Sequence, residues 1–282
     1  MNLLRRAILF MILSTMAFAV MNTQAKHLSE QGFSAYQLLF FRSLGTLMIT
    51  MPYLVWKRMS IWGNKRGLLV LRGVAGAASL LLYFASLSHL PVGTAVVLRY
   101  LSPIFAAFIA VVWLKESVRP IQWLFFLLAF AGVLLIKGVG GDMSWLGLGL
   151  ILSSAIILGL VFVSIAKIGT SDHPMVIINY FMAMGTILGG LLSIYFWKNP
   201  IGTQWWWLIG LGWIGFIGQL FMTKAFQMAA THQVAPLKYL EVLFTVMMGI
   251  VWFGEFYSLW ALLGMVMVLT GLLLNMFFKS AK

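Results

Sequence analysis

Apolar runs of about 20 residues recur from one end of the chain to the other, and this feature restricts the fold more than any other. Apolar residues make up 62% of the 282 positions, and charged residues only 9%. A soluble fold would alternate apolar stretches with charged faces, because most of its surface contacts water. Runs of this length instead match a bilayer whose hydrocarbon core is about 30 Å thick. The sequence therefore predicts an all-α integral membrane protein.

The polar residues between the runs predict ten transmembrane helices joined by short loops. At a rise of about 1.5 Å per residue, each run is long enough to cross a bilayer with some tilt. The first run follows Arg5 and Arg6 and imitates a secretory signal. It is long for a signal core, so we interpret it as the first helix. The expected spans are 7–26, 34–56, 67–88, 92–114, 120–137, 145–167, 175–197, 205–229, 234–253 and 259–278.

The basic residues of the loops predict the orientation, because Lys and Arg concentrate in cytoplasmic loops. With a cytoplasmic N-terminus, eleven basic residues lie inside and three outside. Both termini should therefore be cytoplasmic, in a multi-pass protein of a bacterial cytoplasmic (inner) membrane. The inside set is Arg5, Arg6, Lys57, Arg58, Lys65, Arg66, Lys115, Arg119, Lys167, Lys279 and Lys282, and the outside set is Lys26, Lys137 and Lys198.

Several classes of function lack the residues that they need. The formal charge of +13 would suggest a nucleic-acid partner, but the 19 basic residues fall mostly in short loops, without a recognition motif. We therefore predict no nucleic-acid partner. The absence of cysteine excludes disulfides and thiolate chemistry. The four histidines fall near loops without ligand spacing, so we predict no metal site and no cofactor.

An internal repeat is found when the chain is compared with itself at an offset of 139 residues (238 − 99 = 139). We expect a first domain at 1–138 and a second at 139–282, each with five helices. Because five is odd, the second half would be inverted relative to the first, as in many secondary transporters. The aligned residues are Arg99-Tyr100-Leu101 with Lys238-Tyr239-Leu240, Phe105 with Phe244, Trp113 with Trp252, Glu116 with Glu255 and Gly132 with Gly271.

At these residues the chain resembles a drug/metabolite transporter with two EamA domains. The resemblance covers nearly the whole length and includes Trp113 to Glu116 and Trp252 to Glu255, at the ends of the fourth and ninth helices. The segment 235–241 is also similar to a motif of some members, including S-adenosylmethionine importers, and 40–42 (Phe-Phe-Arg) to a motif found widely in the family. The resemblance implies that substrate binds centrally between the halves and that access alternates without ATP hydrolysis.

Charged residues inside the spans are candidate functional groups, because a charge at mid-bilayer costs about 2.5 to 3.5 kcal/mol on insertion scales. Helix geometry places Arg42 and Arg99 roughly 10 to 12 Å below the outer surface. It places Lys224, Lys238 and Glu241 roughly 6 to 10 Å above the inner one. We therefore expect two tiers on opposite sides of the midplane.

Each of these charges has alternative interpretations. Arg99 and Lys238 are repeat-related and interpreted as substrate-facing, with an interior ion pair or snorkelling as alternatives. Arg42 could equally tie neighbouring helices together, and Lys224 is interpreted mainly as snorkelling or structural. Arg72, within the third span, is interpreted as an interfacial anchor.

Glu241 is the only carboxylate predicted well inside a span. A lone intramembrane carboxylate can bind substrate or act as a proton-coupling site, since burial and neighbouring charges shift its pKa in opposite directions. A salt bridge with Lys238, one helical turn away, is the alternative. Its repeat partner is Ser102.

Uncharged neighbours complete the predicted site. Pro103 cannot donate a hydrogen bond to the Arg99 carbonyl, which predicts a kink in the fourth helix. On the ninth helix, polar and small residues recur at helical spacing and should face a cavity; they are Lys238, Glu241, Thr245 and Gly249. The tyrosines at 100 and 239 could stack on a planar ligand or bind it through their hydroxyls, with packing as the alternative. The predicted substrate-binding set is Arg42, Arg99, Lys238, Glu241, Tyr100, Tyr239, Ser102 and Thr245.

Together these features predict a secondary transporter that moves a small organic metabolite through a central basic cavity. The excess of cations favours a carboxylate- or phosphate-bearing solute, including amino acids and zwitterions such as S-adenosylmethionine. The alternatives are a channel, for which a filter-like run is missing, and an intramembrane enzyme, for which paired catalytic groups are missing. We predict no enzyme activity. The sequence leaves open the substrate, the direction, the coupling ion and a homodimer.

Overall fold

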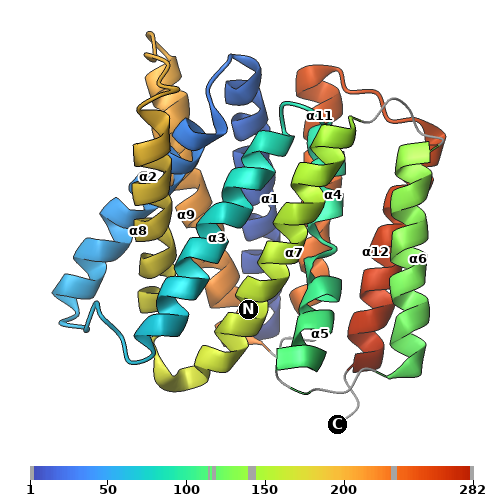
Figure 1. Cartoon of the computed structure of the whole chain (residues 1–282), viewed down its shortest axis with the longest axis horizontal. Coiled ribbons are helices and arrows are strands. Elements are labelled where there is room, and N and C mark those ends of the chain that lie inside the picture. The colour runs from blue at the N-terminus through green and yellow to red at the C-terminus, as the bar shows by residue number, and fades with distance from the viewer. Residues whose placement is uncertain (1–2, 114, 116–118, 139–143, 230–233, 280–282) are drawn as a thin grey trace.

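The computed structural model describes residues 3–113, 115, 119–138, 144–229 and 234–279, and these residues form helices without any strand (Figure 1). The elements are α1 (Leu3–Glu30), α2 (Ala35–Trp56), α3 (Arg66–Ser86), α4 (Val92–Arg99), α5 (Ser102–Trp113), α6 (Pro120–Gly138), α7 (Trp145–Ile168), η1 (Gly169–Ser171), α8 (Pro174–Ser193), α9 (Gln204–Met228), η2 (Ala235–Tyr239), α11 (Leu240–Phe253) and α12 (Leu259–Lys279).

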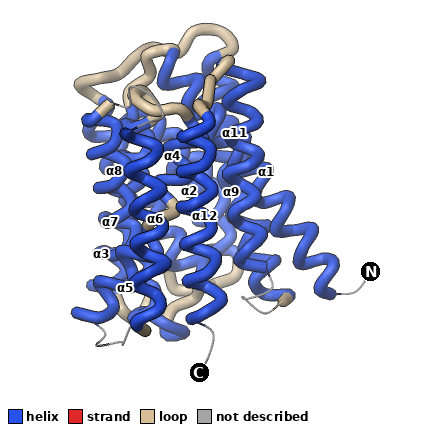
Figure 2. Tube along the Cα trace, turned by 90° about the vertical axis from the view of Figure 1, so that its right-hand side faces the viewer, coloured by secondary structure: helices blue, strands red, loops and turns tan. Residues whose placement is uncertain are grey.

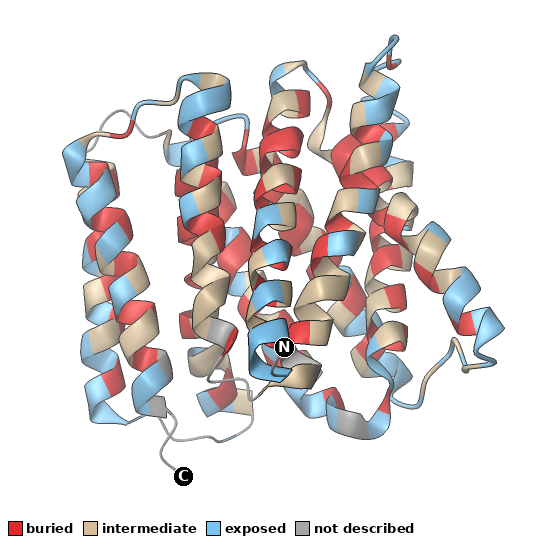
Figure 3. Ribbon diagram, turned by 180° about the vertical axis from the view of Figure 1, so that it is seen from behind, coloured by how far each residue is buried: buried red, intermediate tan, exposed pale blue. Residues whose placement is uncertain are grey.

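The helices match the expected spans closely. Within the described residues, nine segments are long and apolar enough to cross a membrane, and a tenth apolar helix covers Leu259–Asn275. An all-helical membrane protein is therefore confirmed. The apolar exterior agrees with this setting, because large hydrophobic side chains such as Val112 and Phe256 are exposed around the bundle. Buried residues face inward between the helices in Figure 3.

Two of the expected spans are interrupted. The fourth is divided into α4 and α5, with Tyr100 and Leu101 between them. Pro103 then occupies the first turn of α5, where its missing N–H has no helical partner to lose. The ninth span begins as the 3₁₀ helix η2 and continues as α11. Both interruptions fall at the repeated Tyr-Leu pair of the sequence.

The order of contacts repeats between the two halves. α1 packs along α9 in the way that α7 packs along α3, and α5 packs on α7 as α11 packs on α1. The first helix of each half runs in the opposite direction to its counterpart, since α1 rises where α7 descends (Figure 1). α1 begins at the same end of the bundle at which α12 ends (Figures 1 and 2).

The tightest helix contact joins α6 and α12 at one edge of the bundle (Figure 1). A Cβ on Gly132 would lie 2.6 Å from the carbonyl oxygen of Gly264, and one on Gly271 would lie 2.6 Å from that of Phe125. The two contacts correspond through the repeat, because Gly132 and Gly271 are 139 positions apart (271 − 132) and so are Phe125 and Gly264 (264 − 125). The spacing seen in the sequence therefore recurs in the packing. These glycines let the two backbones approach closely.

The same spacing relates two further contacts between helices. A Cβ on Gly73 of α3 would lie 3.0 Å from the Tyr180 carbonyl oxygen, and one on Gly212 of α9 would lie 2.9 Å from that of Phe41. Again both members differ by 139 (212 − 73 and 180 − 41). The two halves thus pack on each other through equivalent surfaces.

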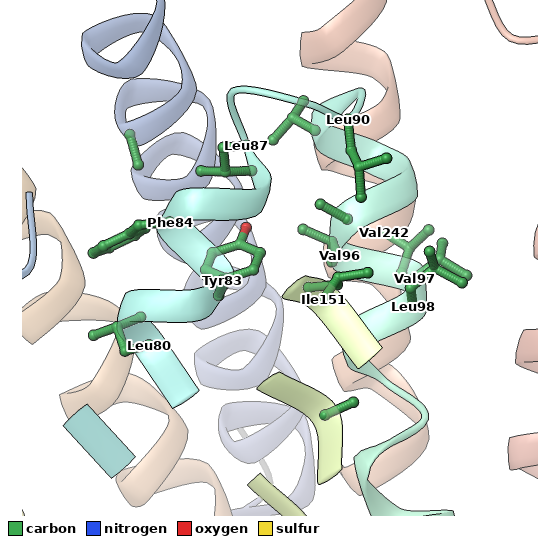
Figure 4. Close-up of a cluster of buried hydrophobic side chains, with 14 of the residues drawn as sticks. Leu80, Tyr83, Phe84, Leu87, Leu90, Val96, Val97, Leu98, Ile151 and Val242 are labelled. Carbon is green, nitrogen blue, oxygen red and sulfur yellow. The ribbon is translucent and has the colours of Figure 1, made fainter. Parts of the chain in front are cut away.

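An apolar core cluster joins side chains from most of the helices, those of α3 and α4 among them. In Figure 4 the side chain of Tyr83 lies on the side of α3 that faces α4, and Val96 lies on the side of α4 that faces α3, whereas Leu80 and Phe84 lie on the opposite side of α3. This packing fixes α4 although it has only eight residues. The core therefore supports the helix whose last residue is a candidate functional group.

Lys26 differs from its predicted position in an outer loop. α1 continues to Glu30, so that Lys26 lies inside the helix and is buried. Its Nζ donates hydrogen bonds to the carbonyl oxygens of Leu87 at 2.7 Å and Leu90 at 3.2 Å. The sequence placed the end of the helix too early, because a Lys in an apolar run marks a boundary only when it faces water.

Candidate functional site

A cavity of about 910 Å³ lies between the two halves and reaches the surface at one end. Exposed Lys115 and Arg119 line it at the end of the bundle where α12 ends, which we call the mouth. Buried Val96 lines its far end, toward the start of α4. The other lining residues are Phe18, Met21, Asn22, Arg42, Leu80, Tyr83, Arg99, Tyr100, Ser102, Pro103, Ala107, Gln122, Leu158, Phe162, Phe181, Gln219, Met222, Lys238, Tyr239, Glu241, Leu272 and Asn275.

Arg42 is buried in the cavity wall without a carboxylate partner. Its Nη1 donates to the Thr46 hydroxyl at 2.6 Å, and its Nε donates to the Met21 sulfur at 3.1 Å. In the described part of the chain, no carboxylate lies within 4 Å of it. A guanidinium held only by neutral groups keeps its positive charge available to a ligand.

Arg99 is the last residue of α4 and lies against an aromatic ring. Its guanidinium carbon is 4.4 Å from the centroid of the Tyr83 ring, within the range of a cation–π contact. Among the described residues, the Arg99 Nε, the Tyr83 hydroxyl and the Asn22 Oδ1 are buried and have no hydrogen-bond partner. Because buried polar atoms without partners are unfavourable, water or a bound solute would be stabilised at this wall.

Glu241 is bound by neutral donors rather than by Lys238. Asn22 Nδ2 donates to its Oε1 at 3.0 Å, and the Tyr100 hydroxyl donates to its Oε2 at 2.8 Å. The Lys238 Nζ lies 5.7 Å from the centroid of the Tyr100 ring and 5.8 Å from that of Phe18. The structure therefore does not form the salt bridge between Lys238 and Glu241 that the sequence left as an alternative.

The expected separation into two tiers is not observed. Tyr100 follows Arg99 directly, yet its hydroxyl reaches both the Glu241 carboxylate and the Lys238 carbonyl oxygen, the latter at 3.1 Å. The interruptions of both helices at the Tyr-Leu pair bring these residues together. Depth counted along a straight helix missed this, because both spans are interrupted along their length.

Most of the predicted site residues line the one cavity. The lining members are Arg42, Arg99, Tyr100, Ser102, Pro103, Lys238, Tyr239 and Glu241. Thr245 does not line it, because its hydroxyl is buried and donates to the Glu241 carbonyl oxygen at 2.7 Å, one turn back in the helix. Of the predicted polar stripe, Lys238 and Glu241 line the cavity, whereas Thr245 and Gly249 do not.

Two other basic residues lie outside the cavity wall. The Lys224 Nζ is 5.6 Å from the ring of Phe10. The guanidinium carbon of Arg72, interpreted from the sequence as an interfacial anchor, lies 4.5 Å from the centroid of the Phe181 ring. Its Nε and Nη1 are buried without a hydrogen-bond partner among the described residues.

Uncharged lining residues such as Phe181 and Met222 escaped the sequence analysis. At the 139-residue offset they correspond to Arg42 (181 − 42) and Tyr83 (222 − 83), which also line the cavity. The same offset that revealed the triplets could have identified them. Asn22 carries no such signal, since only its contact with Glu241 distinguishes it from other polar helix residues.

One of the cations lies at the C-terminal end of a short helix. Arg99 is in the last turn of α4, whereas Lys238 lies in η2, which continues directly into α11. The carbonyl groups at the end of α4 carry partial negative charge, which stabilises a cation there. With Arg42 and Glu241, the described residues of the inner wall include three cations and one carboxylate, a formal charge of +2 (3 − 1). This wall is suited to bind an anionic group.

Known relatives are similar over most of this chain. The chain is 28% identical over 260 residues to the pseudopaline exporter of Pseudomonas aeruginosa, covering 90% of each protein. It is 26% identical over 294 residues to human solute carrier family 35 member G1, covering 97% of this chain and 80% of that protein. The Vibrio cholerae riboflavin transporter is 26% identical over 251 residues, covering 87% and 84%. These relatives are named as transporters rather than enzymes.

The fold and the family agree with these relatives. A solved crystal structure covers 99% of this chain and 98% of its own with a TM-score of 0.64, at 18% identity, which shows a shared fold. The model of the EamA-like transporter family matches twice, at residues 5–138 and 145–277. The chain therefore belongs to the EamA-like transporter family.

Proposed function

We propose that the protein is a secondary carrier of a small organic metabolite that bears a carboxylate or phosphate group. Supporting this, Arg42, Arg99 and Lys238 line one cavity together with the carboxylate of Glu241. Relatives named for export of pseudopaline and for transport of riboflavin support a small-molecule cargo. We place the protein in a bacterial cytoplasmic membrane with both termini inside.

Alternating access is the mechanism that fits a cavity between repeated halves. We propose that residues 1–138 and 139–282 form the two halves and that they tilt against each other around the bound solute. In the occluded state water is excluded, and the formal charge of +2 on the inner wall would repel itself in a low dielectric. Negative charge on the solute offsets this repulsion, so that the loaded carrier closes more readily than the empty one.

Counterflow in proteoliposomes tests this function. A stability-shift screen with S-adenosylmethionine, amino acids and riboflavin first selects a ligand, since binding to the native state raises the unfolding temperature. A carrier gives saturable exchange of labelled ligand against unlabelled ligand, whereas a channel does not. An enzyme would release a chemically altered product.

Two variants and one matched control locate the binding site. Arg99→Ala and Lys238→Ala each remove a cation from the wall, and we expect exchange to fall at least about tenfold, since charged hydrogen bonds stabilise by about 1.5 to 3 kcal/mol. Lys224→Ala removes an equal charge outside the cavity and should keep exchange near the unmodified rate. Normal exchange in both cavity variants would remove these residues from the proposed site.

Glu241 is the proposed coupling residue. If it carries the coupling proton, Glu241→Gln abolishes the response of exchange to a pH jump while binding of the ligand persists. The Gln side chain still offers an oxygen to the Asn22 amide or the Tyr100 hydroxyl, so that the wall keeps its shape. An unchanged pH response would exclude Glu241 from coupling.

A further inference from the structure

A carboxylate outside the cavity closes the end of the bundle opposite the mouth. Glu255 lies between α11 and α12, and its two carboxylate oxygens accept the backbone N–H of Val92 at 2.9 and 3.2 Å. The Tyr257 hydroxyl accepts the N–H of Gly93 at 3.2 Å and donates to Glu255 Oε2. Val92 and Gly93 are the first two residues of α4. One loop of the second half therefore holds the start of a helix of the first half.

The start of α4 needs such a partner. The first N–H groups of a helix have no acceptor within the helix and carry partial positive charge. Pro91 at the N-cap provides no side-chain acceptor. Glu255 supplies the missing acceptor and a full negative charge from a different part of the chain.

The contact is close and largely buried. A Cβ on Gly93 would lie 2.8 Å from the Tyr257 hydroxyl, and one on Gly249 would lie 2.9 Å from the same oxygen, so that only glycine leaves room at either position. Gly254 has a φ of 62°, the left-handed conformation that directs the chain back toward α4. Burial and the hydrogen bond to Glu255 raise the pKa of the Tyr257 phenol, which therefore stays protonated as a donor.

α4 links this contact to the cavity. It begins at Val92, contributes Val96 to the far end of the cavity one turn later, and ends with Arg99 on the wall. The Lys26 Nζ of α1 donates hydrogen bonds to the carbonyl oxygens of Leu87 and Leu90, just before α4 begins. A path from the far end of the bundle into the cavity thus requires α4 to separate from the loop between α11 and α12.

We propose that Glu255 and Tyr257 form a latch that closes the far end of the cavity and positions Arg99 on its wall. Alternating access then requires the hydrogen bonds from Val92 and Gly93 to break, so that the cavity opens on the side opposite the mouth. The inference rests on the alternating-access carrier proposed above and names the contact that holds one of its two states.

The natural absence of cysteine makes the latch directly testable. Val96→Cys reports access to the far end of the cavity, and Ala107→Cys reports access from the mouth. A membrane-impermeant maleimide is applied to intact cells and to inside-out vesicles, and the preparation that labels Ala107→Cys identifies the mouth side. The rate of labelling at position 96 is then measured from the opposite side. No transported solute is needed.

In the Glu255→Ala background, labelling at position 96 from the far side should become about tenfold faster or more, since a hydrogen bond to a charged group corresponds to at least a tenfold equilibrium shift. Tyr257→Phe removes the hydroxyl that bridges Gly93 and Glu255 and should accelerate labelling by a smaller factor. Glu255→Gln retains an acceptor oxygen for Val92 and should restore slow labelling in part.

Glu30→Gln is the matched control, because Glu30 at the end of α1 pairs with Lys26 at 3.4 Å and the glutamine keeps an oxygen for Lys26 while it removes the charge. It should leave labelling at position 96 unchanged. Should Glu255→Ala fail to fold, Tyr257→Phe carries the test. Slow labelling in every folded latch variant, or equally fast labelling with Glu30→Gln, would overturn the latch. Loss of exchange without faster labelling would likewise contradict it, whereas fast labelling with no exchange in any background would count against the carrier alone.

Discussion

The α6–α12 contact and the cavity wall differ in how far they preserve the internal repeat. Between α6 and α12, the repeat-related positions 132 and 271 both carry glycine and make equivalent contacts with the opposite backbone. On the cavity wall the repeat keeps a cation at Arg99 and Lys238 and a tyrosine at 100 and 239, but other repeat-related positions carry different chemistry. Arg42 corresponds to Phe181, and Ser102 corresponds to Glu241.

The difference follows from what each region contacts. Where backbone packs on backbone, both halves meet the same steric limit, and only the smallest residue satisfies it. A solute bound between the halves has no reason to share their twofold relation, so each side of the wall is free to acquire its own charge and hydrogen-bonding groups. The paired glycines therefore reflect a shared packing limit, and the differing pairs of the wall mark candidate recognition groups.

The largest expected effect concerns the symmetric region. Gly132→Ala and Gly271→Ala each place a Cβ against a backbone oxygen, and we expect each to destabilise by about 1 to 3 kcal/mol, because the backbones must separate. Thermal unfolding of purified protein should show similar losses for both. Gly149→Ala in α7 is the control, since a Cβ there meets nothing within 4 Å. A harmless change at one of the two sites alone would break the symmetry that we infer.

Making the wall symmetric should remove function without unfolding the protein. Arg42→Phe copies the residue of the second half into the first, and we expect exchange to fall about tenfold or more, because a cation without a carboxylate partner is lost. Its unfolding temperature should change little, since a buried charge replaced by an apolar side chain of similar size is often neutral. Tyr83→Met, the same operation beside Arg99, should reduce exchange only a few-fold. Full activity of Arg42→Phe would place recognition elsewhere.

The two repeated tyrosines provide a smaller contrast. Tyr100→Phe removes hydrogen bonds to Glu241 and to the Lys238 carbonyl, with an expected loss of about 1 to 2 kcal/mol in stability. Tyr239→Phe should change stability by a few tenths, because the structure records no hydrogen bond from the Tyr239 hydroxyl to a described residue. Chemical denaturation of both variants in the same detergent makes the comparison. Equal losses would show that the wall is more symmetric than its contacts indicate.

The smallest effect lies in a loop where the halves also differ. Burial alone would raise the pKa of Asp172, but the backbone N–H groups of Asn64 and Lys65 outweigh it and hold the pKa below its ordinary value. The carboxylate therefore stabilises the fold above its unfolded pKa of about 3.9, and this stability is lost as the pH falls through the lower folded value. The unfolding temperature should exceed that of Asp172→Asn by a few degrees at pH 7, and the difference should shrink toward pH 3. A difference independent of pH would show that the charge is not responsible.

Much of the architecture could be predicted from the sequence, because a bilayer requires long apolar segments and because the two halves still share similar residues at the 139-residue offset. Arg42, Arg99, Lys238 and Glu241 were identified for the same reason, since a charge is conspicuous in an apolar run. The rotation and tilt of each helix could not be predicted. Residue counts give the depth of a residue along a helix but not the direction of its side chain, so Thr245 was assigned to the cavity although its hydroxyl donates to the Glu241 carbonyl oxygen.

Uncharged recognition groups were the other gap. Asn22 and Phe181 line the cavity but look like ordinary helix residues in the sequence. Glu255 was aligned with Glu116 in the sequence, but its hydrogen bond to Val92 depends on a turn at Gly254 that brings distant segments together. Glu116 itself lies outside the described residues. Contacts of this kind require the folded arrangement, because no local pattern encodes them.

The position of Arg99 at the C-terminal end of α4 bears on how fast a solute could leave. The carbonyl dipoles at that end partly offset its positive charge, so it can remain in the membrane interior when no anion is present. An arriving carboxylate gains less than it would from an isolated charge. Moderate attraction of this kind keeps residence times short, which favours turnover over tight storage.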